Sequence, residues 1–478
     1  MAENMGKWPS GHGQLTKIRL SDGCGGKPVE RRRNLSMIAM DLKAIWEMSD
    51  KLFGVREGRE SPMLDLIGRR RHRVSALAQN VPRAAIRILG AFALTLAIVG
   101  CASPERLLAV PIGQASKATL SDIPNARVRP TDGLGSFVRI FLDAVKRERA
   151  YLAKQGHRGA LPPANYLAIS GGAEDGAFGV GVLVGWTASG TRPVFKTVTG
   201  VSTGALIAPF AFLGSQYDET IKTLYTSIGP DSIFEKRGLI TAYYQDAFAD
   251  TAPLRRLVRQ HVTMKILAGV AREYEKGRVL LILTTDLDAK IPVVWNMGAI
   301  AARGTPQAQR LFQEVLIASA AMPGVFPPVL IDVKVGDKRY QEMHVDGGTI
   351  SQLFLYPTRL HVRKVARRYK ISRKRRVYII RNARLDPNWA SVKRRTLSIL
   401  GEALSALIAA QGRDAITKIY LAANRDGLDF NLAYIPATFN EKAKVPFENR
   451  YMRALYKVGY DLARKGYRWN KKPPGYVE

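Results

Sequence analysis

One serine stands in a local pattern that is typical of a catalytic nucleophile. Ser202 lies in Gly200-Val-Ser202-Thr-Gly204, a G-x-S-x-G pattern. In such a pattern the serine occupies a tight turn from a strand into a helix, which holds its hydroxyl out at the end of a sheet. The glycines let the backbone pass close to its neighbours on both sides. The chemistry that this arrangement predicts is attack of the Ser202 hydroxyl on a carbonyl carbon.

A glycine-rich segment before the serine could hold the negative charge that such an attack creates. Gly171, Gly172, Ala173 and Gly176 follow the apolar residues 166–169. Backbone N–H groups at a turn from a strand into a helix point outward and bind anions. The segment lacks the G-K-[S/T] of a nucleotide-binding loop, and no acidic residue closes a ribose site. We therefore favour an oxyanion hole over a phosphate site.

A carboxylate that could remove the proton of the serine stands much later in the chain. Asp346 precedes Gly347 and Gly348, which let the chain turn sharply after a predicted strand. A carboxyl at its ordinary pKa of about 4 is a weak base, and burial would raise that pKa. A Ser-His-Asp triad is the alternative, because His344 lies two residues away on the same strand face and His361 follows.

Short apolar runs that alternate with helical patterns supply the elements that would position these residues. Residues 194–199 are predicted to form the strand before Ser202, and residues 205–213 the helix after it. Residues 231–250 contain aromatic and polar side chains and are a candidate flap over the site. Further strands are expected at 166–169, 279–284, 292–295, 377–380 and 429–435, and further helices at 182–186, 254–266, 311–321, 394–410 and 452–464.

The composition describes a large folded chain with a strongly basic character. The 478 residues are 46% hydrophobic, which allows a large core in two or three domains at most. The 73 Lys and Arg residues exceed the 40 Asp and Glu residues and give a net charge of +33. Such a charge attracts anionic lipid, lipopolysaccharide or nucleic acid, although an Arg-rich proteome gives the same excess. Nucleic acid is disfavoured, because the basic run 359–395 lacks a recognisable binding module.

Metal and disulfide chemistry are not indicated by the sequence. Cys24 and Cys101 stand in unlike contexts, and the six histidines form no metal-binding pair. Asp286 and Asp288 follow a predicted strand with no histidine or cysteine nearby, so turn chemistry accounts for them best. We therefore expect no metal and no cofactor.

The first hundred residues resemble an export signal preceded by an extension. Residues 1–62 are polar, basic and weakly patterned, and are either a poorly ordered extension or a mis-assigned start. An arginine-rich run at 69–73 then precedes the uncharged stretch 88–100. This stretch is too short to span a bilayer as a helix but suits the apolar region of a signal peptide.

The cysteine at the end of that stretch completes the pattern. Ile98-Val-Gly-Cys101 resembles a bacterial lipobox. The resemblance implies a lipoprotein signal peptide at 63–100, cleavage before Cys101 and lipidation of its thiol. Because Ala102 rather than an acidic residue follows, the resemblance also implies an outer-membrane location.

The flanks of the predicted catalytic part have different expected roles. Residues 101–160 are expected to form a surface tether and an amphipathic helix, because prolines and glycines are frequent over 102–135 and apolar residues recur at helical spacing over 137–154. A helix lying on a membrane is the alternative for 137–154.

Residues 356–478 are basic, contain predicted strands and are expected to complete the same domain. Their cations would form a solvated face or contact anionic headgroups.

Four blocks in this order resemble the patatin-like phospholipase family. They are the glycine loop that begins at Gly171, the elbow around Ser202, the segment ASAAMPGVFPP at 318–328, and Asp346-Gly-Gly. The resemblance covers about residues 165–350. It implies an α/β fold, namely a three-layer sandwich with a mostly parallel central sheet flanked by helices, and a catalytic domain at 161–355.

The resemblance also implies a mechanism. Ser202 would be the nucleophile and Asp346 the base of a Ser–Asp dyad without histidine. The oxyanion would accept hydrogen bonds from the backbone of Gly171, Gly172 and Ala173 and from the N–H of Thr203. The substrate would be a lipid acyl ester, such as a phospholipid or lysophospholipid, and an anionic membrane surface would be a partner.

Two residues of the glycine loop depart from the family pattern G-G-G-x-[K/R]-G. Ala173 replaces the third glycine, and Asp175 takes the basic position. Because alanine tolerates positive φ poorly, we expect Ala173 in an ordinary region of backbone space. The missing cation removes one contribution to stabilising the oxyanion. A non-catalytic, lipid-anchored scaffold or lipid-binding lipoprotein with the same fold is therefore the alternative function.

Overall fold

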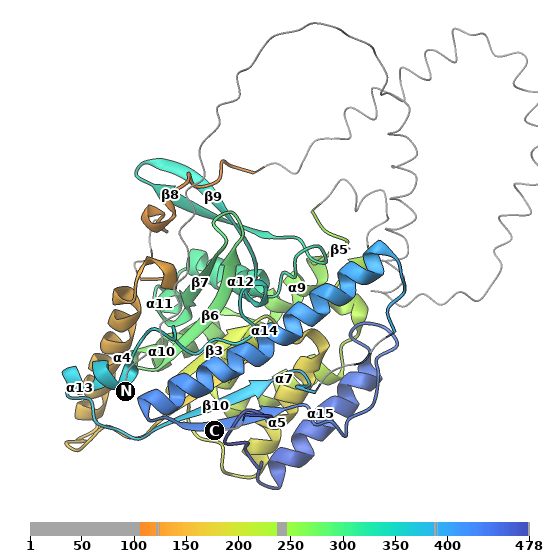
Figure 1. Cartoon of the computed structure of the whole chain (residues 1–478). Helices are drawn as coiled ribbons and strands as arrows, with labels where there is room; N and C mark the ends of the chain where they lie inside the picture. Colours follow the sequence, from red (N-terminus) through yellow and green to blue (C-terminus); the bar gives the residue numbers. More distant parts are fainter. Residues whose placement is uncertain are drawn as a thin grey trace, which may run out of the picture. The chain divides into compact units, whose positions relative to one another are not determined.

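The computed structural model describes residues 106–120, 123, 125–236, 246–386, 389 and 391–476 (Figure 1). The proposed signal peptide, Cys24 and Cys101 lie outside these residues. Among the helices that are described, none is both long and apolar enough to cross a membrane.

A nine-stranded mixed sheet forms the centre of the described part of the chain. Its strands are β1 (Arg127–Val128), β2 (Ala164–Ile169), β3 (Thr197–Val201), β6 (Val279–Asp286), β7 (Ile291–Asn296), β8 (Val329–Val335), β9 (Lys338–Asp346), β10 (Arg375–Arg381) and β11 (Asp429–Tyr434). Five strands are parallel, in the order β6-β3-β2-β10-β11. Antiparallel β7 and β1 extend one side, and the β8–β9 hairpin pairs with the end of β6.

Helices cover both faces of this sheet, because its parallel strands are buried on both sides. Leu167 and Ile169 of β2 join one core, whereas Tyr166 and Ala168 join another. The first face is covered by α5 (Gly176–Ala188), α6 (Thr203–Leu213), α7 (Asp218–Thr226), α9 (Ala252–His261), α10 (Met264–Glu275), α11 (Met297–Ala301), α12 (Pro306–Ser319) and α15 (Asn449–Arg464). The opposite face is covered by α4 (Gly135–Lys154), α13 (Val362–Arg368) and α14 (Thr396–Asp426). The predicted three-layer α/β sandwich is confirmed.

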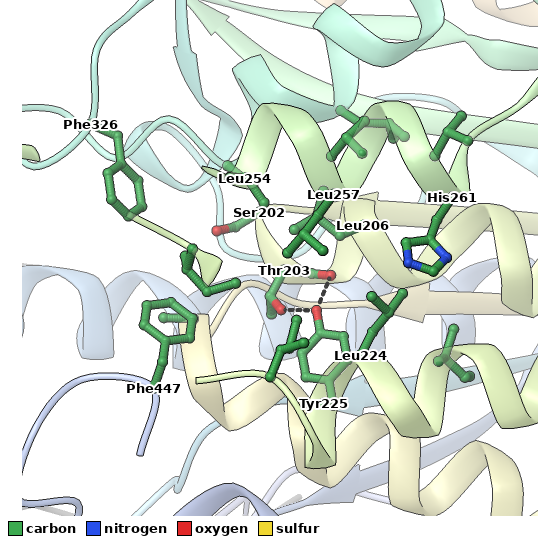
Figure 2. A pocket seen from close by; sticks show the side chains of 18 of the residues that line it. Ser202, Thr203, Leu206, Leu224, Tyr225, Leu254, Leu257, His261, Phe326 and Phe447 are labelled. Carbon is green, nitrogen blue, oxygen red and sulfur yellow. Dashed lines mark hydrogen bonds between the residues drawn. The ribbon is translucent and has the colours of Figure 1, made fainter. Parts of the chain in front are cut away.

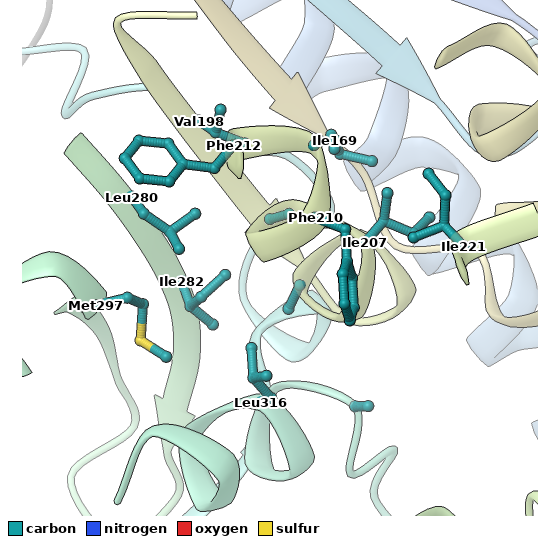
Figure 3. Packing of buried hydrophobic residues seen from close by; sticks show 14 of the residues in the cluster. Ile169, Val198, Ile207, Phe210, Phe212, Ile221, Leu280, Ile282, Met297 and Leu316 are labelled. Carbon is teal, nitrogen blue, oxygen red and sulfur yellow. The ribbon is translucent and has the colours of Figure 1, made fainter. Parts of the chain in front are cut away.

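The larger core surrounds the helix that follows Ser202. Figure 3 shows Ile207 and Phe210 of α6 packed among side chains of β6 and α12, such as Ile282 and Leu316. Nearly every residue of α6 is buried, as expected of a helix that is apolar on all sides. The helix behind Ser202 is therefore held by packing on every side, even though Pro209 removes one of its backbone donors.

The expectation of a surface tether over 102–135 does not hold at residues 127–129, which are attached to the sheet. Arg127 and Val128 form β1, which pairs with β7 at the edge of the sheet. Arg127 and Arg129 both bind the buried carboxylate of Glu342 on β9. These two ion pairs attach the segment to the sheet. Detaching it would leave the buried carboxylate of Glu342 without its two arginine partners, which is costly in free energy.

Other elements differ from the sequence-based expectations mainly in their bounds. The helix expected at 254–266 is two helices, α9 and α10, which meet at Val262 and Thr263. Helix α4 packs its apolar side on the sheet, as expected for residues 137–154. The part from 356 onward contributes β10 and β11 to the central sheet, so the chain after residue 355 belongs to the same folded unit.

Candidate active site

Ser202 occupies the strained turn that its local pattern predicts. It lies between β3 and α6 with φ 54° and ψ −127°, a conformation that costs free energy for any residue except glycine. Its N–H donates to Ser319 Oγ at 3.1 Å, and Ser319 donates to the carbonyl of Leu283 at 2.7 Å. The end of α12 and strand β6 therefore hold the turn in place.

The two glycines of the elbow are required by close backbone contacts. A Cβ on Gly204 would lie 2.3 Å from the carbonyl oxygen of Ile169, and a Cβ on Gly200 would lie 2.4 Å from that of Gly204. No side chain fits at either distance, so the first turn of α6 lies directly against β2 and β3. This contact sets the position of Ser202 at the end of the sheet.

Asp346 reaches Ser202 from the end of β9. Residues 284 to 286 of β6 pair with the end of β9, with Thr284 opposite Asp346. The Asp346 carboxyl is buried and accepts a hydrogen bond from the Gly348 N–H at 2.7 Å. It lines the same pocket as Ser202, whose hydroxyl is near enough to lower the pKa of the carboxyl. The structure thus brings together the two residues that the sequence singled out.

The environment of Asp346 suits a base that works near neutral pH. Burial raises the pKa of its carboxyl to about 7, and the hydrogen bonds from Ser202 and Gly348 partly oppose that rise. A base is most effective when its pKa is close to the working pH. Above about pH 7, Asp346 is ionised and can accept the proton of the serine.

Neither histidine of the alternative triad contacts the dyad. The two ring nitrogens of buried His344 are bonded to Thr284 Oγ1 at 2.9 Å and to Glu342 Oε2 at 3.1 Å. His361 precedes α13 and does not contact the Asp346 carboxyl, whose partners are Ser202 and Gly348. Among the described residues, the geometry supports a dyad rather than a Ser-His-Asp triad.

The glycine loop supplies donors, but not all of those expected. The N–H of Gly171 donates to the carbonyl of Gln352 at 3.2 Å, so the expectation that Gly171 is an oxyanion donor is wrong for this state. The N–H groups of Gly172, Ala173 and Thr203 donate to no acceptor within the described part of the chain. Ala173, Thr203 and Ser202 also line one pocket. These three N–H groups are therefore the candidate oxyanion hole.

The conformation of the loop corrects a second expectation. Ala173 has φ 48°, in the left-handed region, and not the ordinary conformation predicted for alanine. Such a conformation costs a non-glycine residue roughly 1–2 kcal/mol. Gly172 beside it has φ 155°, and a Cβ there would lie 2.0 Å from the carbonyl oxygen of Asn382. The close contact of Gly172 with Asn382, directly after β10, fixes the backbone of the loop. Ala173 is thereby held in the left-handed conformation.

A buried arginine compensates for the acidic residue in the loop. Asp175 accepts a hydrogen bond from the Tyr451 hydroxyl at 2.6 Å, and burial raises its pKa to about 7. Arg381, at the end of β10, is buried and interacts electrostatically with Asp175, and its Nη1 donates to the carbonyl of Gly171 at 3.4 Å. The cation that the loop lacks is thus supplied by another strand. The sequence signal was weak, because Arg381 is one of many cations in the run 359–395.

A largely apolar pocket extends from the dyad. Its cavity volume is about 100 Å³, and apolar side chains form most of its lining. Figure 2 shows Ser202 near Phe326 and Phe447, with Leu257 and His261 of α9 toward the other end. The Thr203 hydroxyl bonds the Tyr225 hydroxyl in the wall. An apolar pocket that begins at a nucleophile can hold a hydrocarbon chain next to the reacting carbonyl.

The candidate flap at 231–250 contributes to this pocket. Ile233 lines it, and Phe234 and Phe248 pack in an aromatic cluster with Phe326. The short hairpin of β4 (Glu235–Lys236) and β5 (Ala249–Asp250) belongs to the same segment. Residues 237–245 lie outside the described residues.

No group of acidic, histidine or cysteine side chains in the described residues could hold a metal ion. Asp286 accepts from the Ala289 N–H at 3.2 Å, which is turn chemistry, and Asp288 binds Arg106. The expected role of Asp286 in a turn is confirmed.

Comparison with known proteins finds a family model that matches the central segment. Residues 167–358 match the model of the family described as patatin-like phospholipase. The matched segment is thus similar to patatin-like phospholipases, and it contains both Ser202 and Asp346. The match ends before β10, so Arg381 lies beyond it.

Two solved structures resemble the chain at low similarity. VipD from Legionella pneumophila is 13% identical, with 63% of this chain and 66% of VipD covered and a TM-score of 0.33. ExoU from Pseudomonas aeruginosa, solved in complex with SpcU, is 14% identical, with 64% and 52% covered and a TM-score of 0.28. The chain thus spans just under two thirds of VipD and about half of ExoU. No curated protein matches the sequence.

Proposed function

We propose that the protein is a serine acyl hydrolase that cleaves lipid acyl esters through Ser202 and Asp346. The Ser202 oxygen attacks the ester carbonyl while Asp346 accepts the hydroxyl proton. Asp346 returns this proton to the leaving alcohol, and an acyl ester of Ser202 remains. Water, deprotonated by Asp346, then releases the fatty acid and restores the serine. The observation that carries the proposal is the buried, high-pKa carboxyl of Asp346 in contact with a strained serine.

The oxyanion of each tetrahedral intermediate would accept hydrogen bonds from Gly172, Ala173 and Thr203. All three N–H groups are fixed before the substrate arrives, so little reorganisation is needed during the reaction. The apolar pocket would take the acyl chain, which explains why 22 residues, mostly apolar, line a cavity around one serine. This arrangement favours a long-chain ester, such as a phospholipid or lysophospholipid, over a polar ester.

A lipid panel tests the proposal. The purified chain is incubated with mixed micelles of phospholipid, lysophospholipid or triacylglycerol, and released fatty acid is measured. We expect release from at least one phospholipid class by the wild-type chain and none by the Ser202→Ala variant. Correctly folded protein that hydrolyses no ester would favour the alternative of a non-catalytic scaffold, which the departures at Ala173 and Asp175 motivate.

We also propose that the protein is lipid-anchored at Cys101 in a bacterial outer membrane, because Ala102 rather than an acidic residue follows the cysteine. Metabolic labelling with a radioactive fatty acid tests this proposal. The wild-type chain should be labelled and sediment with membranes, whereas a Cys101→Ser variant should carry no label. Equal labelling of both chains would contradict the proposed anchor.

The Arg381→Gln variant is expected to lower kcat about tenfold with little change in KM. Arg381 donates to the carbonyl of Gly171, and the N–H of Gly172 belongs to the same planar peptide and points the opposite way. The guanidinium therefore aims and polarises the Gly172 donor without touching substrate. Steady-state kinetics on a soluble ester measure the effect, and Arg381→Lys should recover part of kcat. A loss of thermal stability with unchanged kcat would show that Arg381 is structural only.

The Ala173→Gly variant should keep its activity and be at least as stable as the wild-type chain. Glycine adopts φ near 48° without the cost that alanine bears, which offsets its greater flexibility in the unfolded state. The Ala173→Val variant should lose roughly 2 kcal/mol of stability, because a β-branched residue is a strong outlier at positive φ. Thermal unfolding of the two variants measures the difference. A stable Ala173→Val variant would contradict the assigned loop conformation.

A further inference from the structure

The first four turns of α14 leave large apolar side chains uncovered. Leu400 is 60% exposed, Leu404 is 50% exposed and Leu407 is 68% exposed. The second half of the same helix is different, because Ile416 and Ile419 are buried against β10 and β11. One half of α14 is thus core, and the other half carries an apolar surface that no described residue covers.

The exposed leucines lie on one side of the helix. Leu400, Leu404 and Leu407 follow the i, i+4, i+7 spacing that lines up side chains on an α-helix. Glu402 is the one charged residue between Thr396 and Gln411, and it lies away from the leucine side. A solvated helix of this length normally carries several charges on its exposed side. The pattern is therefore that of a helix side that contacts an apolar phase.

Exposed cations and an exposed tryptophan precede this helix in the chain. Lys393, Arg394 and Arg395 directly precede α14 and are exposed, and the Trp389 side chain is 85% exposed. Positive charges at the start of a helix oppose its dipole, so they do not serve the stability of the helix. Leucines and tryptophan beside Lys and Arg are the composition of helices that lie in the interface of an anionic bilayer.

The apolar side ends near the candidate active site. Gln411, one turn after Leu407, donates to the carbonyl of Thr349 at 3.4 Å, and Thr349 ends the short turn that follows Asp346. Gly412 packs on the guanidinium of Arg381, where a Cβ would lie 2.6 Å from Nη2. Figure 1 shows α14 as the long blue helix that crosses in front of the sheet. The end of the apolar side at Gln411 therefore lies close to the segment that carries Asp346.

We propose that the α14 docking surface, defined as Trp389, Lys393, Arg394 and the side chains of Leu400, Leu404 and Leu407, binds anionic lipid bilayers. The leucines and the tryptophan enter the headgroup region, and the cations pair with lipid phosphates. Docking brings the pocket to the membrane that contains its substrate. The inference rests on the proposed lipid acyl hydrolase activity for its purpose, but binding is measured separately from hydrolysis.

Vesicle sedimentation tests the surface. The full chain, made with Cys101→Ser to prevent lipidation, is mixed with vesicles of phosphatidylcholine alone or with 30% phosphatidylglycerol, the second at low and high salt. The Leu400→Ser/Leu404→Ser/Leu407→Ser variant should bind both kinds of vesicle roughly tenfold more weakly or worse. The Lys393→Gln/Arg394→Gln variant should lose on the order of tenfold in binding to the anionic vesicles alone, with a weaker dependence on salt. The matched control is Leu421→Ser, an exposed leucine in the other half of α14, which should bind like the parent chain.

The activity of the same variants separates this inference from the proposed function. Hydrolysis of a soluble short-chain ester should be unchanged in both variants, whereas hydrolysis of vesicle lipid should fall with binding. If no variant hydrolyses any ester but binding falls as expected, the docking surface stands and the proposed function fails. Unchanged binding by the triple serine variant would overturn the docking surface. A changed oligomeric state or a lower thermal stability of the triple serine variant, relative to its parent chain, would also overturn the docking surface. Either result would mean that another copy or another segment of the chain covers the leucines.

Discussion

The Ser202→Gly variant is expected to lose all ester hydrolysis and to be more stable than the wild-type chain. The hydroxyl that attacks the substrate is gone, so no acyl ester can form. At the same time glycine adopts φ 54° and ψ −127° without the strain that serine bears, which costs about 1–3 kcal/mol. The greater flexibility of glycine in the unfolded chain lowers the stability by about 0.5–1 kcal/mol. A net gain on the order of 1 kcal/mol should therefore appear in thermal or denaturant unfolding.

The Ser202→Ala variant is the matched control for this gain. It removes the same hydroxyl but keeps a Cβ in the strained conformation, so it should be equally inactive without the increase in stability. Equal stability of the glycine and alanine variants would contradict the strained elbow. Residual hydrolysis in either variant would show that a different residue is the nucleophile.

The Asp346→Asn variant is expected to lower kcat by about 10²–10⁴, the usual contribution of a general base. Asparagine preserves the shape of the side chain and can still bond Ser202 and Gly348, but it cannot accept the hydroxyl proton. In the wild-type chain kcat should rise as the pH passes about 7, because Asp346 must be ionised to act. A pH–rate profile measures both effects. A loss in His344→Gln as large as that in Asp346→Asn would instead support the triad.

The same carboxyl should leave a signature in stability. Its pKa in the folded chain is about 7, above its value in the unfolded chain, so the folded state binds more protons between about pH 4 and pH 7. Stability therefore falls as the pH rises through this window, and the fall is smaller in Asp346→Asn. The pKa of Asp175 is also raised to about 7, so Asp175 contributes to the same loss of stability, and Asp175→Asn would remove its contribution. Thermal unfolding of the wild-type chain and of each variant at pH 5 and pH 8 measures the two contributions.

The nucleophile and the base could be predicted because each is marked by its own neighbours in the chain. The glycines around Ser202 and after Asp346 are needed for tight local turns, and such needs are visible in sequence. Local sequence could not predict which N–H groups of the glycine loop are free to bind an oxyanion and which are already hydrogen-bonded. Gly171 is engaged by Gln352 and Arg381, which come from distant parts of the chain.

The same distinction explains the conformation of Ala173 and the role of the arginine. Intrinsic preference places alanine at negative φ, but the contact of Gly172 with Asn382 overrides that preference. Arg381 is one cation in a basic run, and only the pairing of β10 with β2 brings it to the loop. Where tertiary packing decides, local sequence does not show the outcome.

The identity of the residue that reacts with a fluorophosphonate is the most direct test of the account. The purified chain is treated with such a probe, digested, and the labelled peptide is located by mass spectrometry. We expect a single adduct on Ser202, absent in Ser202→Ala and formed far more slowly in a folded Asp346→Asn variant. An adduct on another residue, or no adduct on folded wild-type protein, would contradict the assignment of Ser202 and Asp346 as the catalytic pair.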